Sequence, residues 1–225
     1  MNALRNICAV VPVKETRDAK QRLAGVLTPR QRQELALAML EDVLAALTAV
    51  PKLSGILVVT IDPAAAAIAA RHGSRIVADG ARDGHTGAVA AATRRLAAEG
   101  RGLLEVPGDI PLVEADDVSE LIAAHGRAPA FTIVPARDQR GSNAVLCSPP
   151  DAVPLRFGEN SFFPHLAAAR ACGIEPKVMA LPRIALDIDT PDDLALLLAA
   201  ASRTRARELL DAWRIDLGDG IRASA

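Results

Sequence analysis

The sequence predicts a single α/β domain, residues 1–225, in which helices sandwich a mainly parallel, mixed sheet. Apolar runs of strand length alternate along most of the chain with longer segments of helical periodicity, which is typical of parallel strands joined by crossover helices. With 225 residues, 50% of them hydrophobic, the chain is long enough to bury a substantial core in one domain. No internal repeat or low-complexity linker indicates a domain boundary.

The first strand is expected at residues 7–13, where a near-continuous apolar run is typical of a strand that is buried on both faces. A helix should follow it. Thr28 and Gln31 have capping-box spacing, Pro29 occupies the first helical position, and apolar residues then recur every four positions. The next elements are expected in the order strand 54–62, helix 63–73, strand 75–79, helix 86–99, strand 102–109 and helix 114–125.

The alternation changes after residue 130. Segments 130–136 and 143–150 are separated by the polar loop "RDQRGS" and are expected to pair as antiparallel strands, either as an insertion or at a sheet edge. The segment "IALDIDTPDD" is expected to be a strand that leads into a helix capped by Thr190. A C-terminal helical segment at about residues 190–217, as one long helix or two shorter ones, should pack on the domain or contact a second subunit.

Charge and cysteine content exclude several classes of protein. The formal net charge of −1 gives no field that favours nucleic acid, and no run of 18 apolar residues predicts a membrane span. Cys8, Cys147 and Cys172 are odd in number, far apart and without metal-ligand spacing, so that a reducing cytoplasm fits best. No P-loop, GxGxxG turn or GxSxG elbow follows a strand.

Charged residues gather at three expected strand ends, which is where ligands bind in open α/β sheets. Residues 14–32 follow the first strand and carry six Lys or Arg against two carboxylates, a local charge of +4. Asp109 follows a second strand, and Asp187 and Asp189 follow a third. Taken singly, these features could be a solvated loop, a turn and a helix cap. Together, cations that face carboxylates can hold a nucleoside triphosphate with Mg²⁺.

A more specific signal comes from four segments, which follow one another over about residues 7–197. They are "VPVKETRDAKQRL", "VPGDIPLV", "DQRGSNAVLCSPPDAVPLRFGENSF" and "LDIDTPDDL". In this combination the chain resembles the 2-phospho-L-lactate guanylyltransferases of coenzyme F-420 biosynthesis, within the molybdenum-cofactor-type nucleotidyltransferases; relatives use phosphoenolpyruvate or 3-phosphoglycerate. The resemblance implies a nucleotidyltransferase-type, Rossmann-like fold. It also implies transfer of GMP from GTP to the phosphate of a small acid, with release of pyrophosphate.

The resemblance further implies roles for individual residues. Because the attacking phosphate is already an anion, no general base is needed and catalysis rests on alignment and charge neutralisation. The expected catalytic residues are Lys20, Arg22 and Asp109. The expected Mg²⁺ ligands are Asp109, Asp189 and, less favourably, Asp187. The expected nucleotide-binding residues are Val13, Lys14, Lys20, Thr60, Asp83 and Thr86. The expected acceptor-binding residues are Gly141, Ser142, Arg156, Gly158 and Ser161, of which Ser161 could also be an ordinary helix N-cap.

The chain departs from the family pattern in the nucleotide loop "DGHTGAV", where Thr86 stands in place of an amide side chain. His85 is interpreted as a loop histidine, and the other histidines, His72, His125 and His165, as helix-end or surface residues. Two alternatives remain open. A nucleotide-sugar-dependent glycosyltransferase could use "DID" as its metal motif, and a noncatalytic relative could bind GTP without turnover.

The expected ligands are GTP, in preference to ATP, and a small phosphorylated acid. Phosphoenolpyruvate ranks marginally before phospholactate because it is an abundant metabolite. We expect no nucleic acid and no membrane partner. A homodimer, and hand-over of the labile product to the next transferase of the pathway, are further hypotheses.

Overall fold

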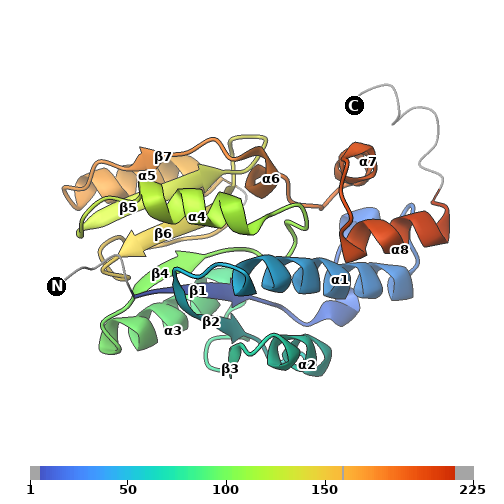
Figure 1. Ribbon diagram of the computed structural model, residues 1–225, viewed down its shortest axis with the longest axis horizontal. Coiled ribbons are helices and arrows are strands. Elements are labelled where there is room, and N and C mark those ends of the chain that lie inside the picture. The colour runs from blue at the N-terminus through green and yellow to red at the C-terminus, as the bar shows by residue number, and fades with distance from the viewer. Residues whose placement is uncertain (1–5, 159, 216–225) are drawn as a thin grey trace.

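Seven strands form a mixed sheet in the part of the chain that the structure describes, residues 6–158 and 160–215 of the computed structural model (Figure 1). Their order is β3-β2-β1-β4-β6-β5-β7. The parallel half consists of β1 (Ile7–Pro12), β2 (Leu53–Val59), β3 (Arg75–Val77) and β4 (Gly102–Glu105). The expected mainly parallel α/β sheet is therefore confirmed.

The other half of the sheet contains the expected antiparallel pair, β5 (Ala130–Pro135) and β6 (Ser142–Ser148). Strand β6 also pairs antiparallel with β4, so it is inserted between β4 and β5 and the sheet-edge alternative is wrong. The edge on this side is β7 (Lys177–Val178), a short strand parallel to β5 that the hydrophobic pattern does not predict.

The two faces of the sheet are covered by different helices, because alternate residues of a strand point to opposite faces. Ile7, Ala9 and Val11 of β1 pack in one cluster with helices α1, α2 and α4, whereas Cys8 and Val10 pack with α3. Helix α5 packs on β5 and β6 on the α3 side. The bounds are α1 (Pro29–Thr48), α2 (Pro63–Arg71), α3 (Gly84–Ala98), α4 (Ala115–Ala124) and α5 (Phe162–Ala171).

Local sequence signals set the ends of several helices. Thr28 and Gln31 form the predicted capping box of α1, with Pro29 at its first position. Helix α2 begins at Pro63 and is capped by Asp62, whose Oδ1 accepts hydrogen bonds from two backbone N–H groups. None of the helices in residues 6–158 and 160–215 combines the length and apolar character needed to cross a bilayer.

The C-terminal segment forms two short helices, α7 (Pro191–Ala199) and α8 (Arg205–Trp213), as one of the two alternatives predicted. Helix α8 packs on α1, where the Asp42 carboxylate accepts hydrogen bonds from the first backbone N–H groups of α8 at 2.8 and 3.0 Å. Residues 216 and 217 of the expected segment lie outside the described residues.

The strand expected in "IALDID" is wrong. Residues Pro182–Ala185 form the short helix α6, and the chain then runs extended to Thr190 without joining the sheet. Two contacts explain this course. Asn143 Nδ2 donates to the carbonyl oxygens of Ile184 and Ala185 at 3.1 and 3.0 Å, and the Ile188 N–H donates to the Asp109 carbonyl oxygen at 3.0 Å.

Candidate active site

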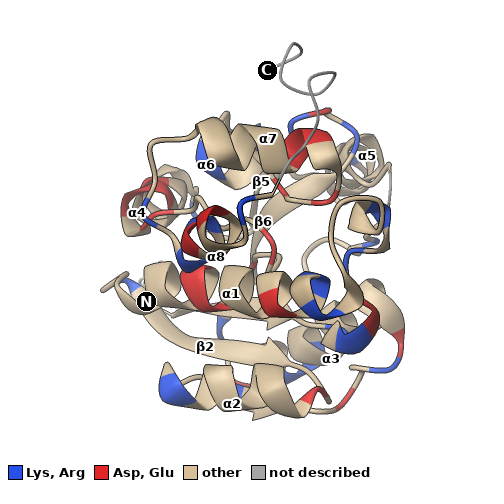
Figure 2. Ribbon diagram, turned by 90° about the vertical axis from the view of Figure 1, so that its right-hand side faces the viewer, with Lys and Arg blue, Asp and Glu red and all other residues tan. Residues whose placement is uncertain are grey.

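A cavity of about 770 Å³ lies beyond the carboxyl ends of the parallel strands, where ligands of open α/β sheets bind. Figure 2 looks onto this end of the molecule, where basic and acidic residues are mixed. Most of the expected site residues line the cavity: Lys14, Arg22, Asp83, Thr86, Asp109, Gly141, Ser142, Gly158, Ser161, Asp187 and Asp189. Segments that are far apart in the sequence therefore meet at one site.

Four expected residues are not part of the lining. The Val13 N–H donates to the Val59 carbonyl oxygen. Thr60 is buried, and its N–H donates to the Val77 carbonyl oxygen. Arg156 is exposed, and its backbone N–H is bound to a histidine ring. Lys20 lies behind two carboxylates that do line the cavity. Contact of these four side chains with a ligand stays a prediction.

Lys20 bridges two carboxylates at the base of the cavity. Its Nζ lies 2.6 Å from Asp109 Oδ2 and 2.7 Å from Asp189 Oδ1, and its side chain is 8% exposed. Burial alone would lower the pKa of Lys20, but the two carboxylates outweigh burial and raise that pKa, so the ammonium stays charged. The residue has a left-handed backbone, with φ 54°, a conformation that costs free energy outside glycine and concentrates at functional sites.

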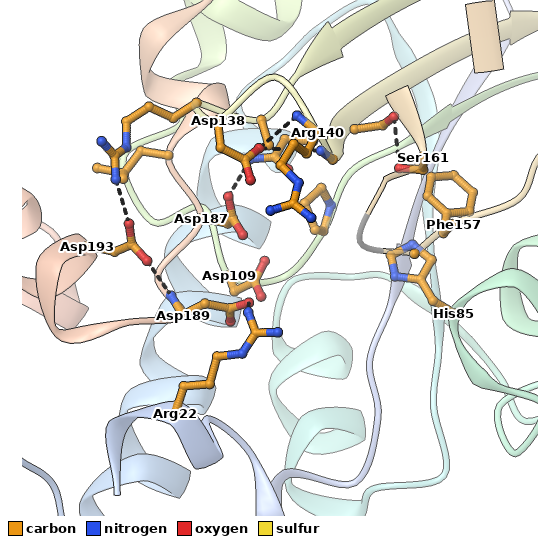
Figure 3. Close-up of a pocket in the computed structure, with 18 of the residues that line it drawn as sticks. Arg22, His85, Asp109, Asp138, Arg140, Phe157, Ser161, Asp187, Asp189 and Asp193 are labelled. Carbon is orange, nitrogen blue, oxygen red and sulfur yellow. Dashed lines mark hydrogen bonds and ion pairs between the residues drawn. The ribbon is translucent and has the colours of Figure 1, made fainter. Parts of the chain in front are cut away.

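Three carboxylates, those of Asp109, Asp187 and Asp189, gather in the cavity (Figure 3), and two of them, Asp109 and Asp189, bind the Lys20 ammonium. Asp187 accepts a hydrogen bond from Asn143 Nδ2 at 2.9 Å; burial and its acidic neighbours raise its pKa. Burial would raise the pKa of Asp189 as well, but Lys20 and Arg22 lower it. Asp189 is therefore more readily ionised than Asp187. Three carboxylates carry more negative charge than the single Lys20 ammonium offsets, so the site is suited to an additional cation.

The loop between β5 and β6 supplies two cations that the sequence analysis did not single out. Arg137 and Arg140 line the cavity together with Asp138. Arg137 Nη2 lies 3.1 Å from Asp193 Oδ1, and Arg140 Nε donates to Asn160 Oδ1 at 2.9 Å. The sequence signal was the loop "RDQRGS", which reads as an ordinary polar turn unless the insertion of β6 is known. These guanidinium groups stand beside the expected acceptor loops.

A histidine links those two acceptor loops. His165 lies in the middle of α5 with 1% exposure, so the expectation of a helix-end or surface position is wrong for it; His72 and His125 are at helix ends as expected. His165 Nδ1 lies 3.0 Å from Ser142 Oγ, and its Nε2 accepts the Arg156 N–H at 3.0 Å. Ser161 occupies the N-cap position of α5, but its hydroxyl donates to Ser142 Oγ at 3.1 Å and makes no cap hydrogen bond.

A second histidine lines the cavity beside Asp83 and Thr86, two of the expected nucleotide-binding residues. His85 belongs to the first turn of α3, not to a loop, and its Nε2–H donates to Glu105 Oε1 at 2.8 Å. The Phe157 ring stacks on it with centroids 4.4 Å apart. Glu105 is fully buried, burial raises its pKa, and its Oε2 has no hydrogen-bond partner among the described residues. The sequence conceals this pair because Glu105 stands inside an otherwise apolar strand.

Thr86 ties the two sides of the cavity together. Its hydroxyl accepts the Phe157 N–H at 3.0 Å and lies 3.3 Å from the Phe157 carbonyl oxygen. The residue therefore joins the start of α3 to the loop that precedes α5, in the position where the family pattern led us to expect an amide. The same bond positions the aromatic ring that covers His85.

The arrangement of buried lysine, converging carboxylates and flanking arginines matches the chemistry of a nucleotidyltransferase, and sequence comparison decides the family. Residues 7–221 match the family described as guanylyl transferase CofC like. The chain belongs to this family. The guanylyltransferase expectation is thereby confirmed, and the glycosyltransferase alternative is not supported.

Relatives with similar sequences are named as guanylyltransferases of different acceptor acids. The chain is 42% identical to a phosphoenolpyruvate guanylyltransferase of Rubrobacter xylanophilus, over 87% of this chain and 95% of the relative. It is 34% identical to a 2-phospho-L-lactate guanylyltransferase of Methanothermobacter thermautotrophicus, over 90% and 89%. Among solved structures, a protein of Desulfovibrio desulfuricans described as a nucleotide-diphospho-sugar transferase superposes with a TM-score of 0.72 at 20% identity, covering 96% of both chains, which shows the shared fold.

Proposed function

We propose that this guanylyltransferase transfers GMP from GTP to the phosphate of a small phosphorylated acid in coenzyme F-420 biosynthesis and releases pyrophosphate. The observation that carries the proposal is the Lys20 bridge between Asp109 and Asp189, two carboxylates that line the same cavity as Ser142 and Ser161. An attacking phosphate needs no base, and the site is rich in charges that orient and neutralise phosphates.

The GTP would lie toward the cationic turn and the start of α3. Lys14 and Arg22 line this part of the cavity and would hold the triphosphate and the leaving pyrophosphate. Asp83 and Thr86 line the wall beside them, where the ribose and base would lie. Lys20 is fixed by its two carboxylates, so its charge is pre-positioned before the nucleotide arrives.

The carboxylates at the base of the cavity support a site for Mg²⁺. No group of three or more potential ligands within the described ranges forms a complete protein metal site, but magnesium commonly takes only one or two carboxylates and completes its shell with phosphate oxygens and water. We propose that Asp109 and Asp189 hold the ion, with Asp187 as a further ligand. When bound, the ion would neutralise negative charge on the phosphates. Asn143 orients Asp187 by its hydrogen bond.

The acceptor would occupy the opposite side of the cavity. Gly141, Ser142, Gly158 and Ser161 line it there, and Arg137 and Arg140 line the same cavity, whereas the exposed Arg156 does not. An arginine can bind a phosphate or a carboxylate through two parallel hydrogen bonds. All three candidate acids carry a phosphate and a carboxylate, which the same residues can bind. Selectivity among the acids must therefore arise from the atoms between these two groups.

We further propose that phosphoenolpyruvate is the first-ranked acceptor and that phospholactate is also accepted. The 42% identity to a phosphoenolpyruvate guanylyltransferase, against 34% for the phospholactate relative, supports this order. The acceptors differ by one small group in the middle of the molecule, which is worth only ~1–3 kcal/mol in a pocket. Incomplete selectivity is the expected result.

The test is pyrophosphate release by the purified protein with Mg²⁺ and GTP or ATP, across phosphoenolpyruvate, 2-phospho-L-lactate and 3-phosphoglycerate. We expect GTP to be preferred and phosphoenolpyruvate to give the highest kcat/KM. Use of 3-phosphoglycerate alone would overturn the acceptor ranking. Binding of GTP without pyrophosphate release from any acid would contradict the transferase proposal and favour the noncatalytic alternative.

Three further proposals concern the protein in the cell. A cytoplasmic location is supported by the free thiols of Cys8, Cys147 and Cys172. A homodimer is checked by light scattering of the purified protein. Hand-over of the product to the next transferase is checked by crosslinking and pull-down from a producing lysate, and failure to recover that transferase would count against it.

A further inference from the structure

His165 is a buried polar residue directly behind the proposed acceptor site. It projects from α5 between the rings of Phe157 and Phe131, with centroids 5.0 and 6.4 Å away. It does not line the cavity, but it is hydrogen-bonded to Ser142, which does. The only other hydrogen bond of its ring among the described residues is with the Arg156 N–H. The ring therefore connects β6 to the loop that leads into α5.

The protonation of this ring follows from its partners. A backbone N–H can only donate, so the His165 Nε2 that faces the Arg156 N–H offers its lone pair. Burial, helped by the nearby His85, lowers the pKa of His165 to about 4, which leaves the ring neutral near pH 7. A neutral imidazole without a proton on Nε2 carries it on Nδ1. The Nδ1–H group therefore donates to Ser142 Oγ.

The acceptor capacity of Ser142 is then filled. Its oxygen accepts one hydrogen bond from His165 Nδ1–H at 3.0 Å and a second from Ser161 Oγ–H at 3.1 Å. A hydroxyl has two acceptor positions and one proton to donate, so only the Ser142 proton is left, and the cavity is where it can find an acceptor. If Ser142 instead donates to Ser161, the unused proton is that of Ser161. One hydroxyl proton still remains for a ligand in the cavity.

We propose that His165 is a positioning residue that makes the Ser142 and Ser161 hydroxyls an obligate hydrogen-bond donor to an anionic oxygen of the acceptor acid. The inference rests on the proposed function and specifies the atom recognised, since a phosphate or carboxylate oxygen accepts and never donates. Without the histidine, one acceptor position of the Ser142 oxygen is open, so the hydroxyl pair can accept a hydrogen bond from water or another donor as well as donate one. The loss of a hydrogen bond to a charged group typically weakens binding ~10–100-fold.

Three substitutions separate this role from a general structural one. His165→Leu removes both hydrogen bonds, His165→Asn can keep an N–H donor at the Nδ1 position, and His165→Gln can keep the contact with the Arg156 N–H but not the donor. The matched control is His125→Leu. His125 is also buried, its pKa is likewise lowered by burial to about 4, and it bonds two hydroxyl groups, those of Thr132 and Ser148, but neither of these hydroxyl residues lines the cavity.

The readout is KM for the acceptor and KM for GTP, measured separately by pyrophosphate release. We expect His165→Leu and His165→Gln to raise the acceptor KM ~10–100-fold and to leave the GTP KM unchanged. His165→Asn should have an acceptor KM much closer to that of the unaltered protein. His125→Leu should leave both KM values unchanged. Equal loss in the Leu and Asn variants, an unchanged acceptor KM in a folded His165→Leu protein, or a parallel rise in both KM values would overturn the proposal.

A second measurement does not depend on turnover. Imidazole ¹⁵N NMR of the full chain, with the His165 resonances assigned by their absence in His165→Leu, should show protonated Nδ1 and unprotonated Nε2 throughout about pH 6–8. The opposite tautomer, or a charged ring in that range, would overturn the positioning role. Absence of pyrophosphate release from the unaltered protein with every acid, beside the expected NMR result, would instead overturn the proposed function.

Discussion

Asp62 holds Thr16 through one carboxylate oxygen, which accepts the Thr16 N–H and the Thr16 hydroxyl at 2.7 Å each. The other oxygen caps α2 by accepting the N–H groups of Ala64 and Ala65. One buried carboxylate thus fastens the cationic turn after β1 to a helix on the face of the sheet. The turn that carries Lys14 and Lys20 is therefore anchored to the core as well as by the ion pairs of Lys20.

Asp62→Asn should loosen this turn while leaving α2 capped, because an amide oxygen still accepts from Ala64 but an amide N–H₂ cannot accept from Thr16. Burial would raise the pKa of Asp62, but its hydrogen bonds hold it below the ordinary value of 3.8. A depressed carboxyl pKa contributes stability above the ordinary value, and that stability is lost as pH falls through the folded value. We expect the variant to lose ~1–3 kcal/mol at about pH 7 and less at about pH 3, by urea denaturation. An equal loss at both values would contradict this.

Glu105→Gln should have the opposite dependence on pH. Burial raises the pKa of Glu105 above its ordinary 4.5, so ionisation costs stability, and this cost grows as pH rises from the unfolded toward the folded value. The substitution removes the charge and keeps an oxygen for His85. We therefore expect Gln to stabilise the protein by ~1–3 kcal/mol at about pH 8 and by little at about pH 4. Destabilisation at both values would show that the ion pair with His85 outweighs burial.

Asp109→Asn and Asp189→Asn should each abolish most turnover while the protein remains folded. Each substitution removes a charge that binds Lys20 and, in our proposal, Mg²⁺. We expect kcat to fall at least ~100-fold at saturating Mg²⁺, measured by pyrophosphate release, with an unchanged circular dichroism spectrum. Asp116→Asn, at an exposed position in α4, is the matched control and should be fully active. Near-normal kcat in both active-site variants would exclude the metal assignment.

Lys20→Met keeps the length of the side chain and removes the ammonium between the carboxylates. Loss of one pre-positioned charged donor typically costs ~10²–10³ in rate, and we expect a decrease in kcat of that size. Lys20→Arg should not rescue activity, because a planar guanidinium does not replace a point charge enclosed by two carboxylates. The exposed Lys52→Met is the control. Rates equal to the control would mean that Lys20 has only a structural role.

Local signals predicted the sheet and its helices well, because they act within a few residues. The Thr28 box starts α1 and the Thr190 box starts α7, as their spacing indicates. The segment "IALDID" failed because its apolar alternation suits a strand, whereas Asn143 captures the carbonyl groups that a strand would have used in pairing. Two-residue β7 is too short for any periodicity to reveal.

The candidate site was predictable where residues follow strands and unpredictable where they lie inside elements. Asp109 and the cations after β1 stand at strand ends, so topology alone brings them together. His165 is on a helix, and which face it presents depends on how α5 packs. Glu105 is the only charged residue in an apolar strand. Its presence there is explained by the hydrogen bond with His85, which the sequence does not reveal. Arg156 does not line the cavity; its backbone N–H is bound by the His165 ring and its side chain is exposed.

The reversed direction of β6 gives the two sides of the cavity different origins in the chain. Because β6 runs against its neighbour β4, its first residue, Ser142, reaches the end of the sheet where the parallel strands finish. One side of the cavity, where we propose that the acceptor binds, is therefore built by one hairpin loop and the approach to α5, whereas the side proposed for the nucleotide is built by the crossover half. Under the proposed function, a change in the hairpin loop would therefore alter the acceptor side of the cavity and leave the residues on the nucleotide side in place.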